Sequence, residues 1–150
     1  MNLLRTLLLV LSGFVLSLPA MADDLFMART SLGFPEAMLK LQDSIRARGY
    51  TVSRVQRVDI GLTRSGYATD KYRVVFFGKA DLVKRLSNDY PQLIPYLPFK
   101  IAIFAEGEET LLVAANPRQL TDREWPELDP VMKQIETDLQ AIFRDMRTER

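Results

Sequence analysis

Asp59, Arg73 and Lys79 are the side chains of this sequence whose types and positions could support chemistry on a small molecule. Asp59 follows a strand-like run at an irregular step, where its carboxylate could act as a general base. Arg73 and Lys79 lie on and after another strand-like run, and together they could bind an anion beside that base. Tyr96, in a proline-flanked stretch, could complete a ligand site. The favoured interpretation of Asp59 is structural, because a carboxylate at such a step can accept backbone N–H bonds.

Three further carboxylates cluster around Gly107, at positions that the pattern predicts to form a tight hairpin turn. They are Glu106, Glu108 and Glu109. A hairpin tip exposes side chains to water, so solubility and turn formation are favoured over acid–base chemistry for these residues.

Cysteine and histidine are both absent from the chain. Their absence excludes a disulfide, a thiol nucleophile, a Ser-His-Asp triad, an attached c-type haem and any zinc site built from Cys and His. The acidic residues also show no EF-hand spacing. We therefore expect no metal and no cofactor.

Residues 1–22 have the pattern of a secretory signal peptide. Arg5 is their only charge, residues 7–18 form an apolar run, and the segment closes with an Ala-x-Ala ending. An uncleaved anchor is the alternative, but the apolar run is shorter than the roughly 20 residues that span a bilayer. The sequence therefore predicts cleavage after Ala22, a periplasmic mature chain without a stable membrane span, and one domain over residues 23–150.

The mature chain has no net formal charge, because loss of Arg5 leaves 19 basic and 19 acidic residues. A neutral balance argues against a nucleic acid or an anionic membrane bound mainly through charge. The partners that remain are a second copy of the chain, a small ligand or a protein of the cell envelope.

Strand-like runs dominate the middle of the chain, and the three strongest are predicted to form the centre of an antiparallel sheet. Two weaker runs add two strands, the second of which continues into a bulge or a short helical turn at residues 56–59. The five predicted strands span residues 25–30, 50–55, 72–78, 99–104 and 110–115.

Two main helices are predicted from apolar residues at helical spacing. The first begins at Pro35 and ends before Gly49, which gives it a proline start and a glycine stop. The second spans about residues 130–145 and follows the core of the domain, which is expected within residues 25–117.

The central strands are apolar on both faces, although a half-exposed antiparallel strand should alternate between apolar and polar side chains. The helices can cover one face only. Val75, Phe77, Phe104 and Val113 therefore need a second cover, which could be another subunit, a ligand or the C-terminal segment. We predict that these four residues form a dimer face.

Several short motifs follow one another in a fixed order: Gly49-Tyr50, Asp59, Phe77-Gly78, Tyr96-Leu97-Pro98 before residues 99–104, and Asn116-Pro117. Their order and spacing resemble the domain of unknown function 302 family over residues 25–117. The resemblance implies an α+β fold of the TATA-binding-protein-like type, a curved antiparallel sheet of about five strands with two main helices on one face, in a β-α-β(4)-α outline. It also implies a sheet that often joins a second copy as a dimer, and it implies no established activity.

Two positions depart from the pattern of that family. Many members have Asn-Pro after the Phe-Gly step, where this chain has Lys79-Ala80. Many also have a histidine next to the aspartate, where this chain has Ile60 after Asp59. Any family role that needs an imidazole is therefore absent from this chain.

The sequence supports three functional hypotheses. The leading one is a secreted, non-catalytic, dimeric binding or accessory module. The alternative is a small enzyme with Asp59 as carboxylate base and with Arg73 and Lys79 as an anion clamp. The third is an envelope accessory protein that meets its partner through an exposed aromatic cluster of Tyr90, Tyr96 and Trp125.

The leader makes a prediction that the mass of the exported protein tests. Because a small residue occupies each key position before the cleavage site, the periplasmic chain should begin at Asp23. Intact-mass spectrometry of the protein from a periplasmic fraction measures this. The double variant Ala20→Arg/Ala22→Arg should keep its leader. A wild-type mass that still includes residues 1–22 would contradict the prediction.

Overall fold

One antiparallel sheet forms the centre of the computed structural model, in which residues 24–121 and 125–147 are described. Its strands are β1 (Leu25–Thr30), β2 (Thr51–Arg57), β3 (Tyr72–Gly78), β4 (Phe99–Glu106) and β5 (Glu109–Ala115). Their order across the sheet is β1-β5-β4-β3-β2, so β1 and β2 form its two edges. The predicted leader, residues 1–22, and its cleavage site lie outside the described residues.

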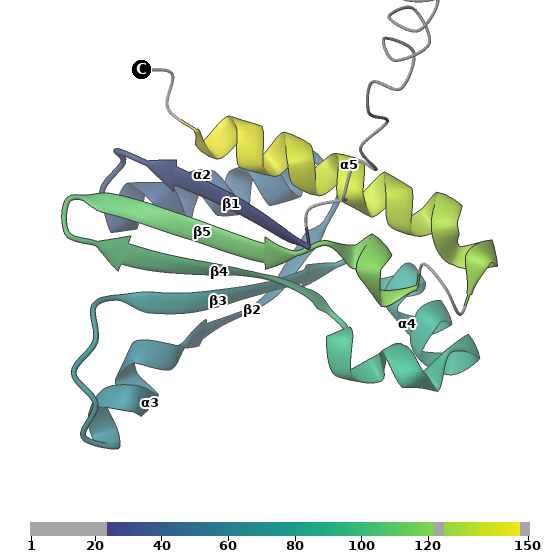
Figure 1. Cartoon of the computed structure of the whole chain (residues 1–150), viewed down its shortest axis with the longest axis horizontal. Helices are drawn as coiled ribbons and strands as arrows, with labels where there is room; N and C mark the ends of the chain where they lie inside the picture. Colours follow the sequence, from purple (N-terminus) through teal and green to yellow (C-terminus); the bar gives the residue numbers. More distant parts are fainter. Residues whose placement is uncertain (1–23, 122–124, 148–150) are drawn as a thin grey trace, which may run out of the picture.

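Helices α2 and α5 lie together on one side of this sheet (Figure 1). The α-helices are α2 (Phe34–Ala47), α3 (Val58–Arg64), α4 (Ala80–Asp89) and α5 (Asp129–Met146), and the 3-10 helices are η1 (Pro91–Tyr96), η2 (Pro117–Leu120) and η3 (Pro126–Leu128). The predicted α+β class is confirmed, with two main helices on one face and a β-α-β(4)-α outline. Within the part of the chain that the structure describes, no helix has the length and apolar composition to cross a membrane.

Local sequence signals determine where several elements begin and end. Pro35 lies in the first turn of α2, and Gly49, with a φ of 76°, follows the end of that helix. Gly107, with a φ of 60°, lies in the tight turn between β4 and β5. After β2 the chain forms the helical turn of α3, one of the two expected alternatives. A shift in the β2–β3 pairing occurs earlier, between Val52 and Arg54.

The main core lies between α2, α5 and one side of the sheet, which we call the covered face. Val75 of β3 pairs with Ile101 of β4, and both side chains are fully buried, as is Phe77. Leu41 of α2 and Ile142 of α5 are buried to the same extent. Full burial of such a side chain stabilises the fold by about 1.5–3 kcal/mol, so this face supplies most of the stabilisation.

Polar contacts hold α5 in place over the covered face. Asp145 accepts a hydrogen bond from Ser44 at 2.6 Å and pairs with Arg48 at 2.8 Å, and these contacts lower the pKa of its carboxyl group. Tyr50 donates its hydroxyl to Asp138 at 2.7 Å, and burial, followed by this bond, raises the pKa of the phenol. The contacts nearer the start of α5 are Arg118 to Asp129 at 2.8 Å and Asn116 to Glu136 at 2.7 Å.

The opposite side of the sheet, which we call the open face, keeps its side chains half-buried or exposed. Leu25 and Met27 at its β1 edge are 52% and 47% exposed. Because paired residues of an antiparallel sheet point to the same side, the register assigns the remaining members. They are Arg29, Thr51, Arg54, Gln56, Tyr72, Val74, Phe76, Lys100, Ala102, Phe104, Glu106, Glu109, Leu111, Val113 and Ala115.

The four residues predicted as one dimer face lie on two different faces of the sheet, so the predicted grouping is wrong. Val75 and Phe77 lie on the covered face and have no exposed surface. Phe104 pairs with Tyr72, and Val113 pairs with Ala102, which places both on the open face. The C-terminal helix α5 packs on the covered face. The open face, which the sequence pattern predicts to need a cover, is therefore not covered by this helix.

Two leucines of α2 provide a matched test of the covered face. Leu41→Ala should lower the free energy of unfolding by about 2–5 kcal/mol, because Leu41 is fully buried and its removal leaves a cavity. Leu39, which is 66% exposed on the same helix, is the control, and Leu39→Ala should cost less than about 0.5 kcal/mol. Urea denaturation measures both. Equal losses would contradict the placement of α2.

Candidate functional site

Asp59 and Arg73 form an ion pair where β2 ends and β3 begins. Arg57, the last residue of β2, pairs with Arg73 in the sheet, and α3 then turns Asp59 back toward that guanidinium. The two side chains are only 15% and 14% exposed. Arg73 also lies over the ring of Phe34, 5.7 Å from its centroid, and donates to the carbonyl of Tyr72 at 3.0 Å. Each charge therefore has a partner within the chain.

The pKa of Asp59 reflects this pairing. The hydrogen bond from Arg73 lowers the pKa of the carboxyl group, and the charge of Arg73 and the neighbouring N–H of Ile60 act in the same direction. A general base at neutral pH needs a pKa near that pH, so the shift is opposite to what base catalysis requires. The arrangement is that of a structural ion pair at the start of α3.

Lys79 follows the other end of β3 and lies far along the strand from this pair. It lies six positions after Arg73, and six steps of an extended strand span about 20 Å. Its ammonium group lies 4.6 Å from the centroid of the Tyr50 ring. The predicted ligand site of Asp59, Arg73 and Lys79 is therefore divided between the two ends of the sheet.

Tyr96 is more exposed to solvent than Tyr90 and Trp125, the other two residues of the predicted aromatic cluster. It ends η1 and is 47% exposed. Tyr90 and Trp125 pack edge to face with centroids 6.1 Å apart, and both contact the core, while Tyr90 donates its hydroxyl to Glu127 at 3.0 Å. The packing of Tyr90 and Trp125 weakens the hypothesis of an exposed aromatic cluster.

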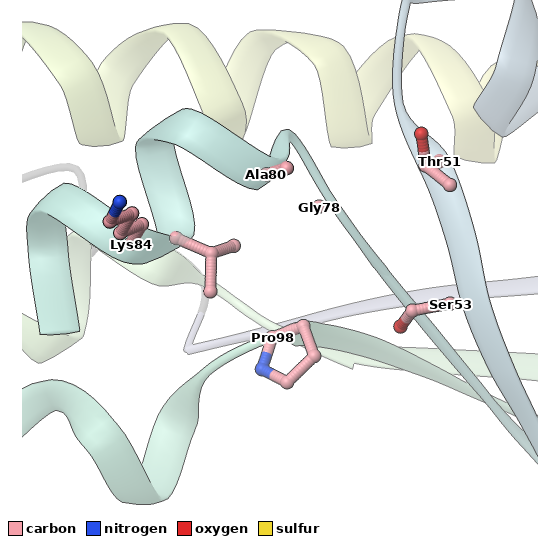
Figure 2. A pocket seen from close by; sticks show the side chains of 7 residues that line it. Thr51, Ser53, Gly78, Ala80, Lys84 and Pro98 are labelled. Carbon is pink, nitrogen blue, oxygen red and sulfur yellow. The ribbon is translucent and has the colours of Figure 1, made fainter.

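A cleft of about 340 Å³ lies under α4, where β3 ends and β4 begins (Figure 2). Thr51 of β2 pairs with Gly78 of β3, which places the cleft on the side of the open face, next to Phe76. Its surface is mostly apolar. The lining residues are Thr51, Ser53, Gly78, Ala80, Val83, Lys84 and Pro98.

The close approach of α4 to the end of β3 shapes this cleft. A Cβ atom on Gly78 would lie 2.7 Å from Cγ2 of Val83, which is closer than real side chains approach. The absence of a side chain at Gly78 therefore lets Val83 pack against the strand. A glycine at a strand-to-helix junction is the one signal of this site in the sequence, which does not indicate that Thr51, Ser53 and Pro98 also line the cleft.

Carboxylates do not gather into a metal site in residues 24–121 and 125–147, where no group of three or more acidic residues has suitable positions. Individual acidic side chains of α5 instead form separate hydrogen bonds and ion pairs that hold this helix against the rest of the domain. Sequence analysis missed this role, because the partners lie far away along the chain.

The chain matches the model of a known protein family and resembles a solved structure. The model of the family "Domain of unknown function DUF302" matches residues 27–146, a longer stretch than the expected 25–117 because it includes α5. The crystal structure of an uncharacterized conserved protein DUF302 from Bacillus stearothermophilus matches with a TM-score of 0.75 and 21% identity, covering 84% of this chain and 100% of that chain. At this identity the likeness shows the fold alone. No curated protein matches.

The Asp59–Arg73 pair predicts a pH-dependent loss of stability in a charge-removing variant. Asp59→Asn should lower the free energy of unfolding at pH 7 by about 1–3 kcal/mol, because it leaves a largely buried guanidinium without its anion. The lowered pKa means that this stabilisation is present above the ordinary carboxyl pKa of about 4 and is lost as the pH falls through the folded-state value. The difference from wild type should therefore shrink in acid.

Asp43 supplies the control for this measurement. Its side chain is 78% exposed and pairs with Arg46 at 3.3 Å, so Asp43→Asn should change stability by less than about 0.5 kcal/mol. Urea denaturation at a series of pH values compares the variants. If Asp59→Asn behaved like Asp43→Asn, or lost stability equally at every pH, the pair would not have the role assigned to it.

Proposed function

The chain belongs to the family of the domain of unknown function DUF302, and from this starting point we propose that it is a non-catalytic binding module of the periplasm whose open face joins two copies as a dimer. The family supplies no activity. The observation that carries the proposal is a sheet with apolar side chains on both faces, of which the chain's own helices cover one.

The centre of the open face has the composition of a protein–protein interface. Phe104 and Tyr72 pack edge to face with centroids 5.9 Å apart, on paired positions of β4 and β3. Val74 and Val113 lie beside them on the same face and are half-buried. Aromatic residues are enriched in the buried core of protein–protein interfaces, which is more apolar than the rim. Their partial exposure in one chain favours a partner that completes their burial.

Charges at the two ends of the open face favour a second copy as that partner. Arg54 and Lys100 lie at the end where β4 begins. Glu106 and Glu109 lie at the other end, where Arg29 pairs with Glu106 at 2.9 Å. A two-fold axis that crosses the strands at the centre of the face reverses the second copy, so its basic end meets the acidic end of the first. Such complementarity fixes the orientation of two copies.

The location and the absence of catalysis are parts of the same proposal. The periplasm is supported by the secretory pattern of residues 1–22. A non-catalytic role is supported by the lack of cysteine and histidine and by the pairing of Asp59 with Arg73. The enzyme hypothesis needed a free base beside an anion clamp, and the separation of Arg73 from Lys79 gives it no support.

The dimer makes a prediction at the centre of the open face. Phe104→Asp should convert a dimer into a monomer, because it places a carboxylate in an apolar interface where it has no partner. Light scattering coupled to size-exclusion chromatography measures the mass. The affinity of the two chains should fall by at least about a hundredfold, which corresponds to the loss of a central anchor worth about 3 kcal/mol.

Leu39→Asp is the matched control for this substitution. Leu39 is the most exposed leucine among the large hydrophobic residues and lies on α2, on the other side of the sheet. The same apolar-to-charged change there should leave the dimer intact. A wild-type monomer, or a dimer that survives Phe104→Asp, would rule out the open face as the interface. So would a dimer that Leu39→Asp disrupts equally.

A further inference from the structure

We propose that the cleft under α4 binds small amphipathic carboxylates, with the apolar part against Gly78, Val83 and Pro98 and the carboxylate at Lys84. The inference rests on the proposed function, since it names a ligand class for the same binding module. It concerns a different surface from the centre of the open face, so the two can be tested separately.

The apolar lining and the size of the cleft favour the hydrocarbon part of such a ligand. Val83, Pro98 and Ala80 line the cleft with carbon atoms, and Gly78 lines it with backbone only, because glycine has no side chain. The volume of about 340 Å³ falls within the range of about 300–1,000 Å³ that is typical of small-molecule sites. An apolar group that enters the cleft would lose its contact with water, which favours binding.

The polar side chains around the cleft favour a carboxylate at its rim. Lys84 is exposed, and the described residues include no hydrogen-bond or ion-pair partner for its ammonium group. Thr51 adds a hydroxyl, whereas Ser53 already donates its hydroxyl to the carbonyl of Phe76 at 3.3 Å. None of the lining residues is acidic. One cation and one hydroxyl donor match the acceptor-only character and the single charge of a carboxylate.

Figure 2 shows how the parts of the site are arranged. Lys84 and Ala80 lie on α4, one helical turn apart, and Pro98 lies below the helix at the entry to β4. Ser53 lies across the cleft on β2. A ligand between these elements would contact three segments that are distant in sequence. The site therefore depends on the folded domain and differs from a patch of surface lysines.

Sodium octanoate is the probe for the first experiment, because it combines a short apolar chain with one carboxylate. The titration is followed in amide NMR spectra of the mature chain. We expect saturable shifts at residues 51–53 and 78–84 and at Phe99, which follows Pro98, and little change elsewhere. The apparent affinity should fall with added salt, because the Lys84 contact is exposed. 1-Octanol, which has the same chain without the charge, should bind more weakly.

Three variants separate the cleft from general binding. Lys84→Gln should weaken octanoate binding about threefold to tenfold, through loss of a charge-assisted hydrogen bond. Ala80→Phe should abolish saturable binding, since Ala80 lines the cleft and a phenyl ring there fills it. Lys133→Gln, which removes an exposed charge from α5, should bind as wild type does. Lys84 is on the surface, so its variant reports binding even if Ala80→Phe does not fold.

Several outcomes would overturn the inference. They are the absence of saturable shifts at the cleft, shifts that spread over the whole open face, and an unchanged affinity in Lys84→Gln. Phe104→Asp distinguishes this failure from failure of the dimer. If that variant is monomeric and still binds octanoate, both proposals stand. A wild-type dimer that shows no saturable octanoate binding would remove the cleft proposal alone.

Discussion

The burial of one face of the sheet by α2 and α5 is the constraint on which the rest of this structure depends. Side chains alternate between the two sides of each strand, so a helical layer can bury only every second residue. Val75, Phe77 and Ile101 take the buried positions. Asp145 and Asp138 fix α5 over them through Arg48, Ser44 and Tyr50. Because α2 and α5 both pack on this side, the apolar residues at the centre of the other side remain partly exposed.

The ion pair of Asp59 and Arg73 and the cleft under α4 lie at opposite ends of β3. At its start, Asp59 and Arg73 satisfy each other and join α3 to the sheet. Beyond its end, the close packing of Val83 on Gly78 leaves a cleft under α4 that opens toward the uncovered side. The ion pair has a structural role, whereas the cleft and the open face are surfaces available to partners. This division is the basis for proposing a binding role for the domain.

Local sequence patterns predict much of this fold, but they do not predict the register between strands. The strand at residues 25–30 and the turn around Gly107 form as predicted, because β-propensity and a positive φ are properties of short segments. The apolar pattern also predicted that one layer of helices would leave a face to be covered. Alternation within β3 could not show that Val75 shares a face with Ile101 and that Phe104 shares one with Tyr72, because that depends on pairing between strands. For the same reason the sequence does not show that Asp59 pairs with Arg73, 14 residues away.

The most direct test of the account asks which atoms of two chains meet. Isotope-filtered NOE spectra of an equal mixture of labelled and unlabelled protein record contacts between chains only. The account predicts cross-peaks from the methyl groups of Val74 and Val113 of one chain to the ring of Phe104 of the other. Contacts between chains that arise from the outer side of α2, at Leu39, would contradict it. So would the absence of any contact from the open face.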